Sequence, residues 1–172
     1  CILFIMLLKK DVEKRMLEDW EAKIWEHYPI RPRVREIDYY IRECTSKILS
    51  KVVEVYNGGE YGDIEETVDD LMRFLATDRK LSPGDSIGLV LYLKYLFLRE
   101  FPELSKDEFI KLNGIIDKIA CMAFDKYMAC REHIYRLRIM EKEREVEMIR
   151  RMVEFYEKAA QRPDFDKIMK RD

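Results

Sequence analysis

Four charged side chains stand among apolar neighbours in the second half of the chain, at Lys94, Asp117, Asp125 and Arg131. Burying a lysine or an aspartate is costly unless its charge is paired. A structural ion pair, such as one between Lys94 and Asp125, is therefore the simpler interpretation, and a small internal ligand site is the functional one. Both stay open here, with Lys94, Asp125 and Arg131 as the candidate ligand site or core ion pair.

The sequence lacks the common catalytic and nucleotide-binding motifs. GxxxxGK[ST], GxGxxG and HExxH are absent. The Glu-x-x-His pair that a four-helix di-iron centre needs twice is also absent, because Ile24 precedes His27 and Cys130 precedes His133 at that spacing. Two histidines leave little material for a zinc site or a catalytic triad. We therefore expect no enzymatic activity, no metal and no cofactor, and an enzyme built on the Asp/Lys/Arg cluster is the weakest alternative.

The cysteines do not suggest a disulfide framework. Cys1, Cys44, Cys121 and Cys130 form no CxxC pair. Cys121 and Cys130 fall on one predicted helix, about 13 Å apart along its axis, which is too far for a bond between them. We expect buried, reduced thiols in a cytoplasmic protein.

Charge and hydropathy indicate neither nucleic-acid binding nor a membrane span. The 32 basic and 34 acidic residues give a formal net charge of -2, which indicates neither a nucleic-acid-binding surface nor a strongly acidic one. The apolar run at residues 1–8 is far shorter than the roughly 20 residues that cross a bilayer, and it lacks the features of a signal peptide. We expect no nucleic acid and no membrane span. Because the chain begins with a cysteine, Met6 is a candidate for the natural start, and whether Cys1–Ile5 is native stays open.

Apolar residues recur at helical spacing throughout the chain, and no long alternating run predicts a strand. A serine caps the start of each of the last two predicted helices: Ser82 before Pro83, and Ser105 with Glu108 in a capping box. The helix after Pro83 is apolar on nearly all sides, which predicts the centre of a bundle. Helices are expected over about 9–27, 36–56, from Asp63 into the mid-seventies, from Pro83 to Phe101, and from Ser105 to about Ala160.

The last of these helices contains no proline and would be roughly 80 Å long, more than twice the width of a small domain. Part of it must therefore project or bend, with the EKERE segment at 141–145 as a solvated stretch or a hinge. Beyond residue 138 its apolar residues recur at spacings of three, four and seven, which predicts a short coiled-coil seam. The seam comprises Ile139, Val146, Ile149, Val153 and Tyr156, of which the last four are the predicted dimer interface.

Three segments resemble the RsbRD N-terminal domain, the input half of RsbR-type regulators of the bacterial general stress response. They are LEDWEAKIWEHYP (17–29), MRFLATDRKLSPGDSIGLVLYLKYLFLREF (72–101) and FDKYMACREHIYRLR (124–138), and the resemblance covers roughly residues 14–138. Arg73, Leu81-Ser82-Pro83 and Leu93-Lys94 match the family's arginine-containing helix, its Ser/Thr-Pro helix start and its Leu-Lys pair. The family's Asn-Pro motif before the second helix is missing, and the STAS or kinase output domain that usually follows lies outside this sequence.

The resemblance implies a globin-like fold without haem and a sensory function. No histidine occurs between Tyr28 and Glu132, so the helix that carries the proximal histidine of a true globin offers no imidazole. Haem ligation would depend on His27 or His133, which we expect on the surface.

The sequence thus predicts an all-α, globin-like helical bundle with a long projecting C-terminal helix. The expected parts are a helical RsbRD-like domain at 9–138, a coiled-coil or linker helix at 139–161 and a charged tail at 162–172. The expected function is that of a cytoplasmic signal-transduction sensor domain, which dimerises and relays a signal through its C-terminal helix to a partner such as a STAS-domain protein or a kinase. The alternative is a non-catalytic accessory subunit that docks on a larger complex, for example a redox complex.

Overall fold

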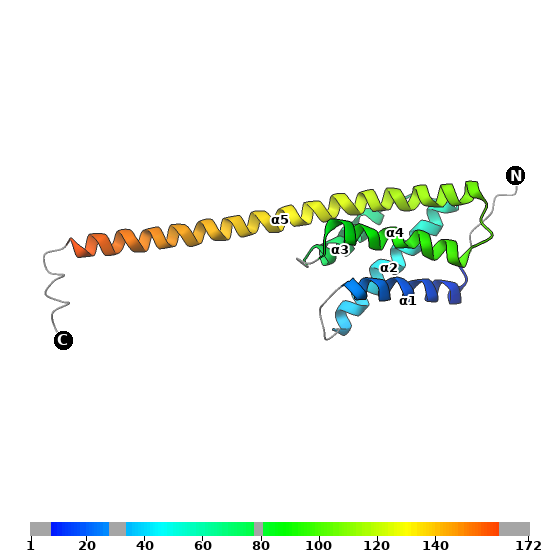
Figure 1. Cartoon of the computed structure of the whole chain (residues 1–172), viewed down its shortest axis with the longest axis horizontal. Helices are drawn as coiled ribbons and strands as arrows, with labels where there is room; N and C mark the ends of the chain where they lie inside the picture. The colour runs from blue at the N-terminus through cyan, green and yellow to red at the C-terminus, as the bar shows by residue number, and fades with distance from the viewer. Residues whose placement is uncertain (1–7, 28–33, 78–80, 162–172) are drawn as a thin grey trace. The chain divides into compact units, whose positions relative to one another are not determined.

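The computed structural model describes residues 8–27, 34–77 and 81–161, and every regular element within these ranges is an α helix (Figure 1). The prediction of an all-α protein with a long C-terminal helix is confirmed. The apolar N-terminal run up to residue 7, most of the IRPRVRE connector and the charged tail at 162–172 lie outside the described residues. The helices are α1 (Lys10–His27), α2 (Arg35–Tyr56), α3 (Ile64–Thr77), α4 (Pro83–Glu100) and α5 (Lys106–Ala160).

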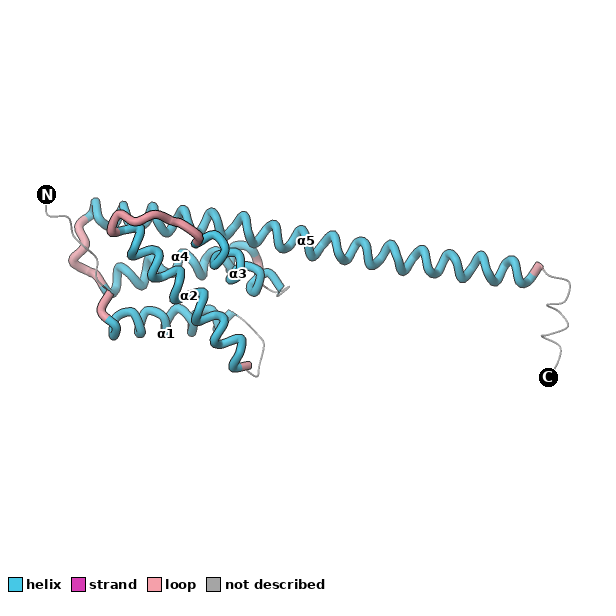
Figure 2. Tube along the Cα trace, turned by 180° about the vertical axis from the view of Figure 1, so that it is seen from behind, coloured by secondary structure: helices cyan, strands magenta, loops and turns pink. Residues whose placement is uncertain are grey.

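The chain divides into two compact units, Cys1–Arg131 and Glu132–Asp172. The first unit contains α1 to α4 and the first half of α5, and Figure 2 draws the loops from α2 to α3 and from α4 to α5 in pink. The described part of the second unit is the remainder of α5, in which the EKERE segment at 141–145 is helical without a break. In the described part of the chain, no helix combines the length and the apolar character that a membrane span requires.

Local sequence signals set the helix ends where they were expected. At the start of α4 the Ser82 hydroxyl accepts a hydrogen bond from the Asp85 amide at 3.0 Å, and the Asp85 carboxylate accepts one from the Ser82 amide at 3.1 Å. The Ser82 hydroxyl also donates to the Asp85 carboxylate at 2.6 Å, and this bond, followed by the one from the Ser82 amide, lowers the pKa of Asp85. Ser105 and Glu108 form the same capping box before α5. α2 ends before Gly58, whose φ of +99° favours glycine.

Two buried aromatic side chains connect the helices of the first unit through backbone carbonyls. Trp20 of α1 is fully buried, and its indole Nε1 donates to the Leu89 carbonyl of α4 at 2.7 Å. Tyr127 of α5 is equally buried, and its hydroxyl donates to the Leu81 carbonyl just before α4 at 2.7 Å. Because each ring buries apolar surface while its polar atom is satisfied, these residues stabilise the core without a desolvation penalty.

Ion pairs add a polar layer around α1. The Glu21 carboxylate is largely buried and accepts three hydrogen bonds from the Arg42 guanidinium of α2, the shortest at 2.9 Å. On the α4 side, Arg15 lies 2.8 Å from Glu100, and Arg99 lies 2.6 Å from Asp19. The hydrogen bond to Glu100 raises the pKa of Arg15, and the same contact lowers the pKa of Glu100. These contacts fix α1 against both α2 and α4.

Helix α4 departs from the prediction that it occupies the centre of a bundle. One side of α4 is buried, including Leu93 and Phe97. Three large apolar side chains at spacings of four and three are exposed instead, namely Leu91, Tyr95 and Leu98. An apolar residue count could not reveal this, because it does not say how many neighbouring helices surround α4.

The cysteines also differ from the uniform burial expected of them. Cys44 is buried in α2, and its burial raises the pKa of the thiol to about 11. Cys130 is half-buried, whereas Cys121 is exposed. Of the three cysteines in the described residues, only Cys44 therefore behaves as a fully internal apolar residue.

Replacing Tyr127 with phenylalanine is expected to lower the free energy of unfolding by about 1–2 kcal/mol, because the Leu81 carbonyl loses its buried donor. Urea unfolding followed by circular dichroism measures the change. Tyr39→Phe is the matched control, since Tyr39 is 70% exposed on α2 and should leave the midpoint unchanged. Equal effects of the two substitutions would contradict the structural role given to Tyr127.

Candidate functional site

The first candidate site, built on Lys94, does not have the predicted geometry. Lys94 Nζ of α4 lies 2.6 Å from Asp117 Oδ1 of α5, and the two side chains are 31% and 53% exposed. Asp125 lies about 12 Å further along α5 and is exposed. The predicted pair between Lys94 and Asp125 is therefore wrong. The sequence offered two aspartates on one helix, and the packing of α4 against α5 selects the earlier one.

Arg131, the third member of that candidate set, has a separate role. Its Nη1 donates to the Ala76 carbonyl in the last turn of α3 at 3.2 Å. A cation at this position satisfies a carbonyl that the helix leaves without an internal partner and suits the negative end of the helix dipole. Lys94 and Arg131 thus have separate partners, and the three residues do not converge.

The second candidate is the coiled-coil seam in the second unit. We define the seam face as Ile139, Val146, Ile149, Val153 and Tyr156, all on α5. Each of these side chains is at least 50% exposed. Spacings of three and four residues hold them on one side of the helix. The structure therefore presents the seam face open to solvent on one side of the helix, with Lys142 between Ile139 and Val146.

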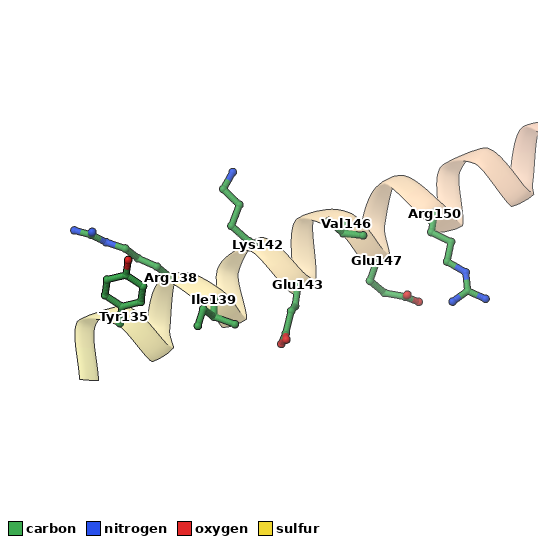
Figure 3. A pocket seen from close by; sticks show the side chains of 8 residues that line it. All are labelled: Tyr135, Arg138, Ile139, Lys142, Glu143, Val146, Glu147 and Arg150. Carbon is green, nitrogen blue, oxygen red and sulfur yellow. The ribbon is translucent and has the colours of Figure 1, made fainter. Parts of the chain in front are cut away.

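Charged residues border the seam face and turn its first half into a shallow groove. Figure 3 shows Tyr135, Ile139 and Val146 along the helix with Arg138, Lys142, Glu143, Glu147 and Arg150 around them. All eight side chains come from one helix, so a second surface is needed to close the groove. This arrangement suits a protein contact better than an enclosed small-molecule site.

Ion pairs within the helix stabilise its polar side. Lys142 Nζ lies 2.6 Å from Glu145, and this hydrogen bond raises the pKa of Lys142. Arg150 and Arg151 pair with glutamates four residues away at 3.2 and 3.0 Å. Such exposed pairs add only a few tenths of a kcal/mol each to an isolated helix, so they do not replace the packing that the apolar side lacks.

A second apolar strip on the same helix was missed at the sequence level. Met148, Met152 and Phe155 are all more than half exposed and follow one another at spacings of four and three. We call them the methionine strip. Helical periodicity places Met148 about 100° around the axis from Ile149, so a contact on the seam face leaves part of this strip uncovered. The spacing is visible in the sequence, but the prediction assigned only the seam residues of this helix to a contact surface.

The structure adds no metal chemistry to these surfaces. In residues 8–27, 34–77 and 81–161, no three His, Cys, Asp or Glu side chains are grouped so that they could hold an ion. His27 and His133 are both exposed.

Comparison with known proteins identifies a relative. An uncharacterized protein of Archaeoglobus fulgidus is 38% identical to this chain over 142 residues, which are 83% of this chain and 92% of the archaeal protein. The chain belongs to the family of this archaeal protein. Because the first unit ends at Arg131, the aligned region includes part of both units. No family model matches the chain, and no solved structure does.

Replacing Lys94 with methionine is expected to change the free energy of unfolding by less than about 1 kcal/mol, because the pair with Asp117 is open to water. A pair buried in the core would lose several kcal/mol when one charge is stranded. Thermal and urea unfolding of the full chain distinguish the two cases. A large loss of stability would mean that water does not screen the pair.

Proposed function

We propose that this protein is a non-catalytic sensory or regulatory module that forms a homodimer through the seam face. The observation that carries the proposal is the exposure of five apolar side chains in a coiled-coil pattern. Apolar surface removed from water contributes roughly 25 cal/mol per Å², which favours association of two such faces. A second copy of the chain offers a matching apolar strip, so this association needs no other protein.

The regulatory part of the proposal is supported by the resemblance to the RsbRD N-terminal domain. On that basis the fold is globin-like without haem, the location is cytoplasmic, and the output partner is a STAS-domain protein or a kinase. Helix α5 suits a relay because one unbroken helix carries Tyr127, which is buried in the core of the first unit, and the seam face of the second. This is a physical connection through the chain, and coupling along it is part of the proposal.

A second candidate function, that of an accessory subunit docked on another protein complex, is favoured by the methionine strip. Met148, Met152 and Phe155 extend the apolar side of α5 beyond what a two-stranded seam covers. Methionine side chains adapt to varied partners because they are unbranched and polarizable. In this function, as in signalling, the strip contacts a different protein.

Light scattering of the full chain is expected to give twice the chain mass of 20.9 kDa. Ile149→Glu should yield a monomer at the same concentration, because it places charges at the centre of the seam face. Met148→Glu is the matched control: Met148 is the adjacent residue and is similarly exposed, but it lies off the seam face and should leave the dimer intact. A monomeric parent protein at high micromolar concentration would contradict the proposal.

Capture of partners with the full chain is expected to recover a STAS-domain protein or a kinase if the module signals, and a stable enzyme complex if it is an accessory subunit. Met148→Glu should abolish that capture and leave dimerisation unchanged, since the methionine strip is expected to contact the partner. Loss of capture with Ile149→Glu alone would instead assign partner binding to the dimer.

A further inference from the structure

We propose that two copies of this chain pair as a parallel, in-register coiled coil over residues 135–160, aligned by ion pairs from Arg138 to Glu143 and from Glu145 to Arg150 of the second copy. This inference rests on the proposed homodimer and specifies its geometry. It commits the seam face to one occupant, the same face of a second chain.

The heptad positions follow from the exposed side chains. With Ile139 as position a, Val146 and Val153 are the next two a residues, and Ile149 and Tyr156 occupy d. All three of these a residues are β-branched, and β-branched side chains at a pack best in a parallel two-stranded coiled coil. In a parallel arrangement the apolar layer therefore favours two strands over three or four.

Charges beside the layer are complementary in the same arrangement. In a parallel pair, each g residue faces the e residue five positions later on the other helix. Arg138 then faces Glu143, and Glu145 faces Arg150, each twice by symmetry. Figure 3 shows Arg138, Glu143 and Arg150 beside the seam, where a second helix could reach them.

Charge alone does not choose the direction, because an antiparallel pair also has complementary e residues. It would join Glu143 to Arg150 and Arg136 to Glu157. Arg136 and Arg150 both already pair with glutamates on their own helix, so these internal pairs do not separate the two directions. The parallel arrangement is the one in which both the β-branched a layer and the g–e charges suit a two-stranded coiled coil, and the variants below test it against the antiparallel one.

Lys142 is the one charged residue at a d position, where a parallel dimer places it opposite its own copy. Its ammonium lies 2.6 Å from Glu145, a g residue on the flank of the seam. The charge is therefore directed out of the apolar layer, which lowers the repulsion between the two copies. A single polar core position of this kind also disfavours shifted registers.

Two double charge exchanges of identical composition test the direction. E145R/R150E re-forms the attractive pairs of the parallel arrangement, whereas E143R/R150E makes both of its pairs repulsive. The antiparallel arrangement reverses this order, because it joins residues 143 and 150. Sedimentation equilibrium of the full-length chain gives the dimer dissociation constant, and circular dichroism checks that helix content is unchanged.

We expect the dissociation constant of E143R/R150E to be at least about ten-fold higher than that of E145R/R150E, which itself exceeds the parent value because Glu145 no longer holds the Lys142 ammonium out of the apolar layer. The difference should shrink in 1 M salt, at a Debye length of about 3 Å. The first exchange removes the Lys142–Glu145 pair, so its rescue cannot come from a better isolated helix. Equal constants for the two variants, or tighter pairing of E143R/R150E, would overturn the parallel arrangement. A monomeric parent would overturn the dimer itself.

Discussion

A long helix in water depends on the packing of its apolar side. This constraint governs the part of the chain after Arg131. Residues after Arg131 form a continuous helix to Ala160, yet their large apolar side chains are exposed. Exposed i,i+4 ion pairs contribute too little to hold such a helix, and isolated helices are marginally stable. We therefore propose that this helix packs against a partner surface, and the seam face of a second copy has suitable apolar and charged positions.

The first unit satisfies the same constraint within one chain. Trp20 and Tyr127 bury their rings and donate to carbonyls of other segments, while Glu21 and Glu100 bind arginines at the edge of the core. Its polar groups are thus used for internal stability. Neither Lys94 with Asp117 nor Arg131 with the Ala76 carbonyl leaves a convergent set of groups for chemistry. The proposed function, recognition of another chain, rests instead on the exposed apolar side chains of α5.

Local features were predictable from the sequence, and tertiary pairings were not. Ser82, Ser105 and the Asn57-Gly58 step act within a few residues, so they gave the helix ends correctly. The partner of Lys94 depends on how α4 lies along α5, which no local signal encodes, and the prediction chose Asp125 in place of Asp117. The seam was visible as a repeat on one helix. The exposed side of α4 was not, because apolar content does not reveal how many neighbours a helix has. The dimer, the partner and the globin-like fold stay predictions.

Hydrogen exchange of residues 139–156 in the full-length chain tests most directly whether a second copy holds this helix. The account predicts that amide protection in this segment rises with protein concentration across the range in which the dimer forms, while protection around Trp20 and Tyr127 stays constant. Protection of residues 139–156 that is independent of concentration would contradict it, because the helix would then be stabilised without a second chain.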